Sequence, residues 1–314
     1  MATSALFENL VLHAPHLSTR QVLPAFIYGT AWKKEATTEL VYQAISNGFT
    51  AIDTAAQPKH YREDLVGAGV SRAIKDGKIR RSDLYLQTKF TSVGGQDPDN
   101  IPYDAKSPIA DQVNASVISS LGNFNFADVV KGDDEAQPYI DTLVLHSPME
   151  SLNDTLEVWQ TLEQYVPNEI RNLGISNCNL FTLMDIYERS TIKPSVVQNR
   201  FYPNTKFDIA VRQFCKEKNI IYQSFWTLSA NPNLVWSNEA GSLAELFKIS
   251  PQSALYCLVL GLGNIVILNG TKKTQHMQED WKAVQKAKEY AESHPAQWQK
   301  IVADFRKLIG QPRP

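Results

Sequence analysis

Four short stretches decide the fold of this chain: FTAIDTAA at residues 49–56, LYLQTKF at 84–90, TLVLHSP at 142–148 and NLGISN at 172–177. Each has the apolar run of a buried strand with one polar residue at or near its carboxyl end, in turn Asp53, Lys89, His146 and Asn177. Such residues cluster on one face only if the strands are parallel and close together. The pattern therefore predicts a carboxylate, an ammonium and an imidazole around one cavity, which is a catalytic site in outline.

Strand and helix signals alternate along the rest of the chain. Eight runs are predicted as strands: 25–28, 50–53, 84–89, 140–146, 170–175, 195–199, 220–224 and 264–268. Amphipathic stretches lie between them, several opened by Ser, Thr or Asp and closed by Gly or Asn. Eight units in roughly 250 residues match a closed (β/α)8 TIM barrel better than an open sheet, because no Gly-rich phosphate turn follows the first strand. We expect residues 1–314 to form one such α/β domain, with a C-terminal helix after about residue 292.

Composition excludes several function classes. The 314 residues are 43% hydrophobic and 20% charged, with a formal net charge of -2, so no cationic surplus is available for nucleic acid. No apolar run approaches the roughly 20 residues of a membrane span, and the N-terminus lacks a secretory signal, so we expect a cytoplasmic protein. Three cysteines without metal-ligand spacing argue against a disulfide framework and against a metal site.

Two segments interrupt the alternation of strands and helices. The polar segment 91–106 follows the Lys89 strand, so it should form a wall of the pocket at the catalytic end of the barrel. The acidic segment 123–137 precedes the fourth strand and should lie at the opposite end, as a solvated insertion.

The chain resembles the aldo-keto reductases over roughly residues 21–281. The resemblance rests on five motifs in the family's order: GFTAIDTAA, LYLQTKF, DTLVLHSP, IRNLGISN and VVQNRFYP. It is similar above all to fungal members in which TAAQPKHY, here residues 54–61, replaces the commoner TAxxY. The resemblance implies a barrel that binds a nicotinamide cofactor without a Rossmann fold and reduces aldehydes or ketones.

Carbonyl reduction needs an acid, because hydride addition to the carbonyl produces an alkoxide. A tyrosine, whose pKa is about 10 when unperturbed, can serve if a cation lowers that pKa. Lys89 would provide the charge, Asp53 would hold Lys89, and His146 would orient the carbonyl oxygen or share the proton transfer. The structural alternatives are an ion pair in the barrel mouth and a hydrogen-bonded core histidine.

The catalytic tyrosine departs from the family pattern. Most relatives place it five residues after the aspartate, where this chain has Pro58, which cannot donate a proton. Tyr61, eight residues after Asp53, is our candidate general acid, with His60 as runner-up and a packed, non-catalytic Tyr61 as the structural alternative. Lys59 is expected in solvent.

Cofactor recognition follows the family in part. Ser176, Asn177 and Gln198 match positions that hold the nicotinamide carboxamide. Gln223, beside Ser224, replaces the tyrosine that stacks on the ring. Either the platform is lost or Phe225 or Trp226 supplies it, and the structural alternative is that these aromatics line the core or the substrate pocket. At the end of the last strand, Asn269, Gly270 and Thr271 replace the Pro-Lys-Ser stretch of the family. Further along, His276 replaces the arginine that binds the 2′-phosphate in relatives. Glu279 and Asp280 match the pair that faces the adenine. We expect NADP(H), with Lys272 or Lys273 as compensating charges, and NAD(H) as the alternative.

The substrate and the assembly are less defined. Trp32, Trp226 and Trp236 suggest a pocket for a bulky or aromatic carbonyl compound, or simply pack the barrel rim. The tail GQPRP at 310–314 is too short for a large lid. A nucleotide-binding barrel that acts as a sensor, as a partner-binding subunit or in a redox-neutral reaction is the second hypothesis. The chain is expected to be a monomer or dimer.

Overall fold

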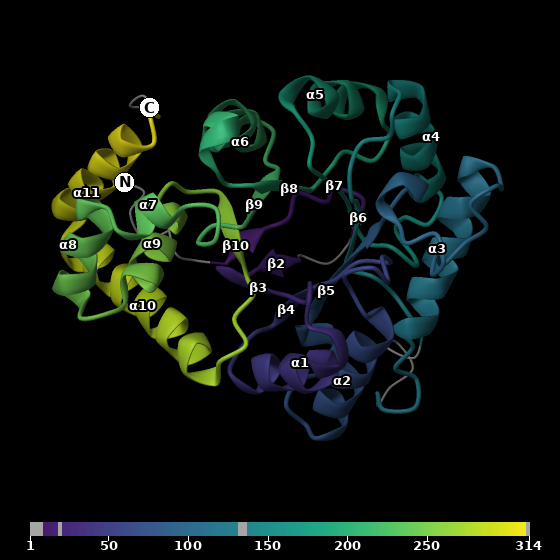
Figure 1. Ribbon diagram of the computed structural model, residues 1–314, viewed down its shortest axis with the longest axis horizontal. Helices are drawn as coiled ribbons and strands as arrows, with labels where there is room; N and C mark the ends of the chain where they lie inside the picture. The colour runs from purple at the N-terminus through teal and green to yellow at the C-terminus, as the bar shows by residue number, and fades with distance from the viewer. Residues whose placement is uncertain (1–8, 18–20, 131–136, 312–314) are drawn as a thin grey trace.

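Eight parallel strands close into a barrel in the computed structural model, which describes residues 9–17, 21–130 and 137–311 (Figure 1). Their order around the barrel follows the sequence, and β10 pairs with β3 to close it. The strands are β3 (Phe26–Gly29), β4 (Ala51–Asp53), β5 (Tyr85–Phe90), β6 (Thr142–Leu145), β7 (Leu173–Ser176), β8 (Val196–Arg200), β9 (Ile221–Phe225) and β10 (Ile265–Asn269). The single-domain (β/α)8 barrel and its eight strand positions are thus confirmed, with ends shifted by a few residues.

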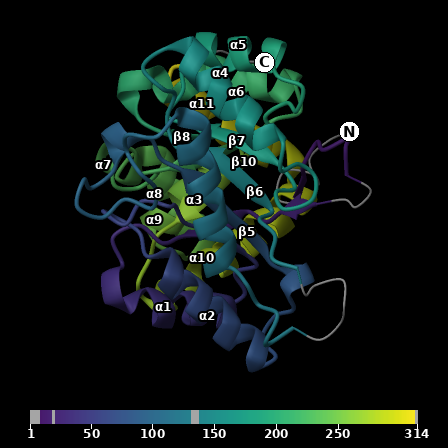
Figure 2. The same cartoon turned by 90° about the vertical axis from the view of Figure 1, so that its right-hand side faces the viewer.

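Helices surround the strands because their apolar faces cover the outside of the barrel. Figure 2 shows α3 and α4 on the side that faces the viewer. The helices that follow the strands in turn are α1 (Thr37–Ser46), α2 (Glu63–Lys75), α3 (Ile109–Asn123), α4 (Leu152–Glu163), α5 (Leu180–Arg189), α6 (Ile209–Glu217), α9 (Pro251–Leu260) and α10 (Thr274–Ser293). Side-chain caps begin several of them. Ser151 accepts from the Asp154 amide, as the sequence predicted, and Asn179, which is not one of the predicted cap types, accepts from the Thr182 amide.

The amino end of the barrel is closed by a short hairpin that the sequence did not reveal. Strands β1 (Leu10–Val11) and β2 (Val22–Leu23) pair antiparallel. Leu12 and Leu23 are buried in one apolar cluster with Tyr85, Val144 and other residues of the barrel interior. This end is therefore packed with apolar side chains, which leaves the carboxyl ends of the strands to form a site.

Two additions complete the C-terminal half. The expected C-terminal helix is α11 (Pro295–Leu308), and the unexpected helices α7 (Pro232–Val235) and α8 (Asn238–Phe247) lie between β9 and α9. Figure 1 shows α8, α9, α10 and α11 gathered on one side of the barrel. No helix in the described ranges is long and apolar enough to cross a membrane.

The two predicted interruptions have different outcomes. Asn100 and Pro102 from the 91–106 segment line a second cavity beside the Gln57–Tyr61 turn, and not the main cavity at the barrel mouth, so the expected wall of the catalytic pocket is not found there. Residues 131–136 of the acidic segment and residues 312–314 of the tail lie outside the described residues.

Candidate active site

The predicted pair of charges lies at the centre of the barrel mouth. Lys89 Nζ donates to both carboxylate oxygens of Asp53, at 2.7 and 2.6 Å, and to the backbone oxygen of Thr54 at 2.8 Å. Each of the two charged residues is only 1% exposed. Burial lowers the pKa of Lys89, while Asp53 opposes that effect. A buried ammonium needs such a set of acceptors, and we therefore describe the two residues as a fixed ion pair.

Three glutamines complete the surroundings of Asp53. Gln87 and Gln198 each donate to its Oδ1, at 2.6 and 2.9 Å. Both also donate to the Oε1 of Gln223 at 2.8 Å, and Gln223 donates back to Gln87 at 2.8 Å. Gln223 is completely buried by these contacts, so it does not form a stacking surface in the cavity. The sequence placed Gln198 and Gln223 near the cofactor but did not reveal that they hold the aspartate.

Tyr61 lies between the ion pair and the histidine. The centroid of its ring is 5.2 Å from Lys89 Nζ and 6.0 Å from the centroid of the His146 ring. Burial, and to a lesser extent Asp53, raises the pKa of Tyr61. This differs from the expectation that Lys89 would lower the pKa, and the main reason is that burial disfavours the tyrosinate. Tyr61 is therefore protonated at neutral pH, which is the state in which a proton donor must begin.

His146 is a neutral side chain. His146 follows β6 directly, and its Nδ1 lies 2.6 Å from the hydroxyl of Thr91, which follows β5. Burial, followed by the charge of Lys89, lowers the pKa of His146 to about 3. With Thr91 as donor, the ring carries its proton on Nε2, and that N–H is available to a carbonyl oxygen in the cavity.

His60, the other candidate acid, is held away from the ion pair by its own turn. The Gln57 amide nitrogen donates to Gly95 O at 2.6 Å, so its Oε1 accepts from His60 Nδ1 at 2.9 Å. The His60 ring also packs against the Trp32 ring, with centroids 3.8 Å apart and an angle of 38° between the ring planes. Burial lowers the pKa of His60, with a further contribution from Lys59, which is exposed as expected.

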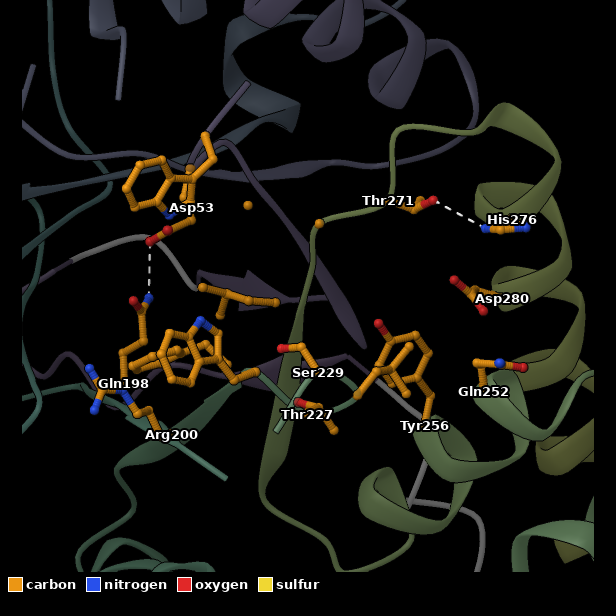
Figure 3. A pocket seen from close by; sticks show the side chains of 18 of the residues that line it. Asp53, Gln198, Arg200, Thr227, Ser229, Gln252, Tyr256, Thr271, His276 and Asp280 are labelled. Atoms are coloured by element: carbon orange, nitrogen blue, oxygen red, sulfur yellow. Dashed lines mark hydrogen bonds between the residues drawn. The ribbon is translucent and has the colours of Figure 1, made fainter. Parts of the chain in front are cut away.

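A cavity of about 740 Å³ extends from this cluster to the start of α10. Figure 3 shows Asp53 and Gln198 at one end and His276 and Asp280 at the other. The predicted site residues that line it are Asp53, Tyr61, His146, Ser176, Asn177, Gln198, Phe225, Trp226, Gly270, Thr271, His276, Glu279 and Asp280. Trp32 also lines the cavity. Trp236 is 71% exposed and does not line the cavity, so its prediction as a pocket residue was wrong.

Three predicted residues lie behind the cavity wall and act through their neighbours. Lys89 holds Asp53, and the completely buried Ser224 bonds to the Thr227 hydroxyl at 2.5 Å. Asn269, also buried, donates to Asp280 at 2.8 Å and accepts from the Thr271 amide at 3.0 Å. For Ser224 and Asn269 the expected direct contact with a cofactor is therefore not supported, because their polar groups are already engaged and shielded.

The end of the cavity at α10, where the sequence predicts the adenosine and which we call the adenosine end, is built more loosely. His276 is exposed, and its Nδ1 lies 3.5 Å from the Thr271 hydroxyl. Asp280 accepts from Ser253 at 2.7 Å, and burial raises its pKa. Nearby, Lys33 donates to Gly270 O at 2.9 Å, and burial, with the charge of Lys272, lowers the pKa of Lys33 to about 8.

Several lining residues escaped the sequence analysis. They come from the end of β8, the loop after β9 and the start of α9, and the polar ones among them are Arg200, Thr227, Ser229, Ser250, Gln252 and Ser253. The Ser250–Pro251 pair, a capping serine followed by proline at the first helical position, was a usable signal for the start of α9. The alternation of β8 likewise places Arg200 on the same face as Gln198.

Comparisons with known proteins agree with this geometry. The chain is 31% identical over 196 residues to the NAD(P)H-dependent D-xylose reductase of Scheffersomyces stipitis, which covers 58% of this chain and 57% of that relative. It is 27% identical over 264 residues to the enzyme of the same name from Kluyveromyces lactis, over 77% of this chain and 79% of the relative. Among solved structures, an aldo-keto reductase of the silkworm Bombyx mori complexed with NADPH superposes with a TM-score of 0.69 at 18% identity, over 90% of this chain and 88% of that one.

The family model described as "Aldo/keto reductase family" matches residues 26–305, from the first barrel strand to the last helix. The barrel, the polar cluster at its carboxyl end and the homology to NAD(P)H-dependent reductases agree with that match. This chain belongs to the aldo/keto reductase family of oxidoreductases.

Proposed function

We propose that the protein is an NADP(H)-dependent oxidoreductase that reduces an aldehyde or ketone to an alcohol, with Tyr61 as general acid. The observation that carries the proposal is the position of Tyr61 at the catalytic end of the cavity, beside Lys89 and His146. The likeness to fungal members with the TAAQPKHY stretch supports it, because the longer turn brings a tyrosine to this point.

Four residues have different roles in the proton transfer. A reduced nicotinamide, when bound, supplies a hydride to the carbonyl carbon. The Tyr61 hydroxyl donates a proton to the oxygen as negative charge develops there, and the nearby Lys89 ammonium stabilises the resulting tyrosinate. His146 donates a hydrogen bond to the same oxygen from Nε2, while Asp53 fixes Lys89. The alcohol then leaves, and Tyr61 regains its proton from solvent.

The cavity fits a nicotinamide dinucleotide. Asn177 Nδ2 is engaged by His146 O at 2.9 Å, which leaves Oδ1 to accept from a carboxamide. Trp226 is 52% exposed and lines the cavity, so it supplies the aromatic platform that Gln223 does not. Lys272 and Lys273 are exposed directly after Thr271, which lines the cavity, and would provide positive charge for a 2′-phosphate. Their charge favours NADP(H), although NAD(H) shares every other contact.

The substrate side of the cavity is aromatic. Trp32, Phe225 and Trp226 line it together with Tyr61. Flat aromatic walls favour a bulky or aromatic carbonyl compound, because ring stacking contributes beyond the apolar area that is buried.

The test follows tryptophan fluorescence while NADPH and, separately, NADH are titrated, and then measures oxidation of the bound cofactor after aromatic aldehydes and ketones are added. We expect saturable quenching that is tighter for NADPH, followed by oxidation. Binding without oxidation by any carbonyl compound would contradict the reductase and support a sensor or a redox-neutral enzyme. Absence of quenching would contradict the cofactor site itself.

A further inference from the structure

Arg200 places a positive charge in the active-site cavity. It is the last residue of β8, two positions after Gln198, so both side chains leave the strand on the same face. Figure 3 shows Arg200 beside Gln198, at the end of the cavity that holds Asp53 and far from His276. Two residues along a strand advance by about 6.6 Å, so Arg200 lies one layer further out than the glutamine that holds Asp53.

The charge of Arg200 is not balanced by the protein. Among the described residues, none accepts a hydrogen bond from its guanidinium, none forms an ion pair with it, and its Nε is completely buried without a partner. Arg200 as a whole is half-buried, and the two buried arginines, Arg81 and Arg212, differ from it. Arg81 pairs with Asp141 at 2.9 Å, and Arg212 donates to Phe207 O at 2.9 Å. A buried donor without an acceptor is unusual in a folded protein and calls for a partner from outside it.

The carboxylates that line the cavity cannot serve as that partner. Asp53 is held by Lys89, Gln87 and Gln198. Asp280 accepts from Ser253 and Asn269 at the opposite end, where Glu279, the third carboxylate that lines the cavity, accepts from Gln275. The anion that complements Arg200 must therefore arrive with a ligand.

Aromatic rings hold the guanidinium in place. It lies 4.5 Å from the centroid of the Trp226 ring and 5.9 Å from that of Phe225. Trp226 has φ 56°, a left-handed conformation that is costly for a bulky side chain and that is found mainly at functional sites. A cation fixed on an aromatic surface loses little freedom when it binds an anion.

We propose that Arg200 binds an anionic group, a carboxylate or a phosphate, of the ligand in the active-site cavity. Two sources share this chemistry: a carboxylate on the carbonyl substrate, and the diphosphate of the cofactor. A planar guanidinium binds either group through two parallel hydrogen bonds. The proposal deepens and rests on the function proposed above.

The experiment compares the full-length protein with R200Q and R200K, and uses R189Q as the control. Arg189 is 56% exposed and pairs only weakly with Asp185, at 3.7 Å, so its variant removes the same charge far from the cavity. Two quantities are measured: the Kd of NADPH by tryptophan quenching, and the ratio of kcat/KM for 4-carboxybenzaldehyde to that for 4-carbamoylbenzaldehyde, an uncharged molecule of the same shape.

Either of two results supports the proposal and identifies the source. A fall of about tenfold or more in the substrate ratio of R200Q, with NADPH binding unchanged, assigns Arg200 to a substrate carboxylate. A rise of similar size in the Kd of NADPH, with the ratio unchanged, assigns it to the cofactor diphosphate. The quantity that changes in R200Q should take an intermediate value in R200K, because lysine keeps the charge but loses the second hydrogen bond. Less than about a twofold change in both quantities, as expected for R189Q, would overturn the proposal.

Failure of the proposed function gives a different pattern. If neither aldehyde is reduced, the reductase assignment fails, but binding of NADPH and of 4-carboxybenzyl alcohol by calorimetry still tests Arg200. If R200Q does not fold, R200K gives the same comparison with a smaller expected change.

Discussion

The two ends of the cavity are built on different principles. At the catalytic end, Asp53 and Lys89 are buried and are held by hydrogen bonds of 2.6 to 2.9 Å from fixed neighbours. At the adenosine end, His276 and Lys272 are exposed, and their nearest polar contacts are 3.5 Å long. The first end is therefore preorganised before any ligand binds. At the second end the buried Asp280 is held at 2.7 and 2.8 Å, but the exposed His276 and Lys272 have no polar contact as short among the described residues. Substitutions should therefore damage the first end severely and only adjust the second.

The strongest test of this contrast removes the buried cation. In Lys89→Met the Asp53 carboxylate stays buried without its partner, so we expect the free energy of unfolding to fall by about 3 to 5 kcal/mol. Turnover should fall at least about a hundredfold, because Tyr61 loses the charge that stabilises its anion. Urea unfolding and NADPH oxidation measure the two effects. Lys59→Met, at an exposed position, should change stability by less than about 0.5 kcal/mol. Equal effects in the two variants would contradict the contrast.

A second test concerns Glu63, which is 7% exposed behind the ion pair and accepts hydrogen bonds from the hydroxyls of Thr88 and Ser120. Burial raises the pKa of Glu63 from 4.5 to about 7. Between these values the folded chain keeps a proton that the unfolded chain has lost, so the free energy of unfolding falls as the pH rises. The fall is at most about 3 kcal/mol.

Urea unfolding at about pH 5 and about pH 8 measures this slope. Glu63→Gln should remove the Glu63 contribution, because the amide does not titrate. An unchanged slope in the variant would show that Glu63 is already ionised throughout the range.

The smallest expected effect is at the adenosine end. His276→Arg should strengthen NADPH binding relative to NADH by about tenfold, because a guanidinium binds a phosphate through two hydrogen bonds. Fluorescence titration with both cofactors gives the ratio, and kcat should not change. Gln285→Arg adds the same charge at an exposed position further along α10, outside the cavity, and should leave the ratio unchanged. A loss of turnover in His276→Arg would mean that the two ends are coupled.

The sequence predicted the barrel and the grouping of polar residues at its mouth because both depend on local patterns. A parallel strand buried on both faces is a continuous apolar run, and the polar residue at its end, such as Asp53 or His146, must face the barrel mouth. Tyr61 was found by counting from the aspartate along the lengthened turn.

Features that depend on long-range pairing were not predictable. Strands β1 and β2 have two residues each, too few for a period-2 pattern, so the hairpin was missed. The contacts of Gln87 and Gln223 join residues 136 positions apart, and no local signal gives them. Trp236 was taken for a pocket residue on its type alone, but the turn after α7 directs it to solvent.

The central claim is that Tyr61, and not its neighbour His60, donates the proton. The most direct measurement is kcat for an aromatic aldehyde at saturating NADPH in Tyr61→Phe and in His60→Gln, with the Kd of NADPH measured for each. We predict that kcat falls by about 10² to 10⁴ in Tyr61→Phe with the Kd unchanged, and by less than about tenfold in His60→Gln. Full turnover in Tyr61→Phe, together with its loss in His60→Gln, would contradict the account.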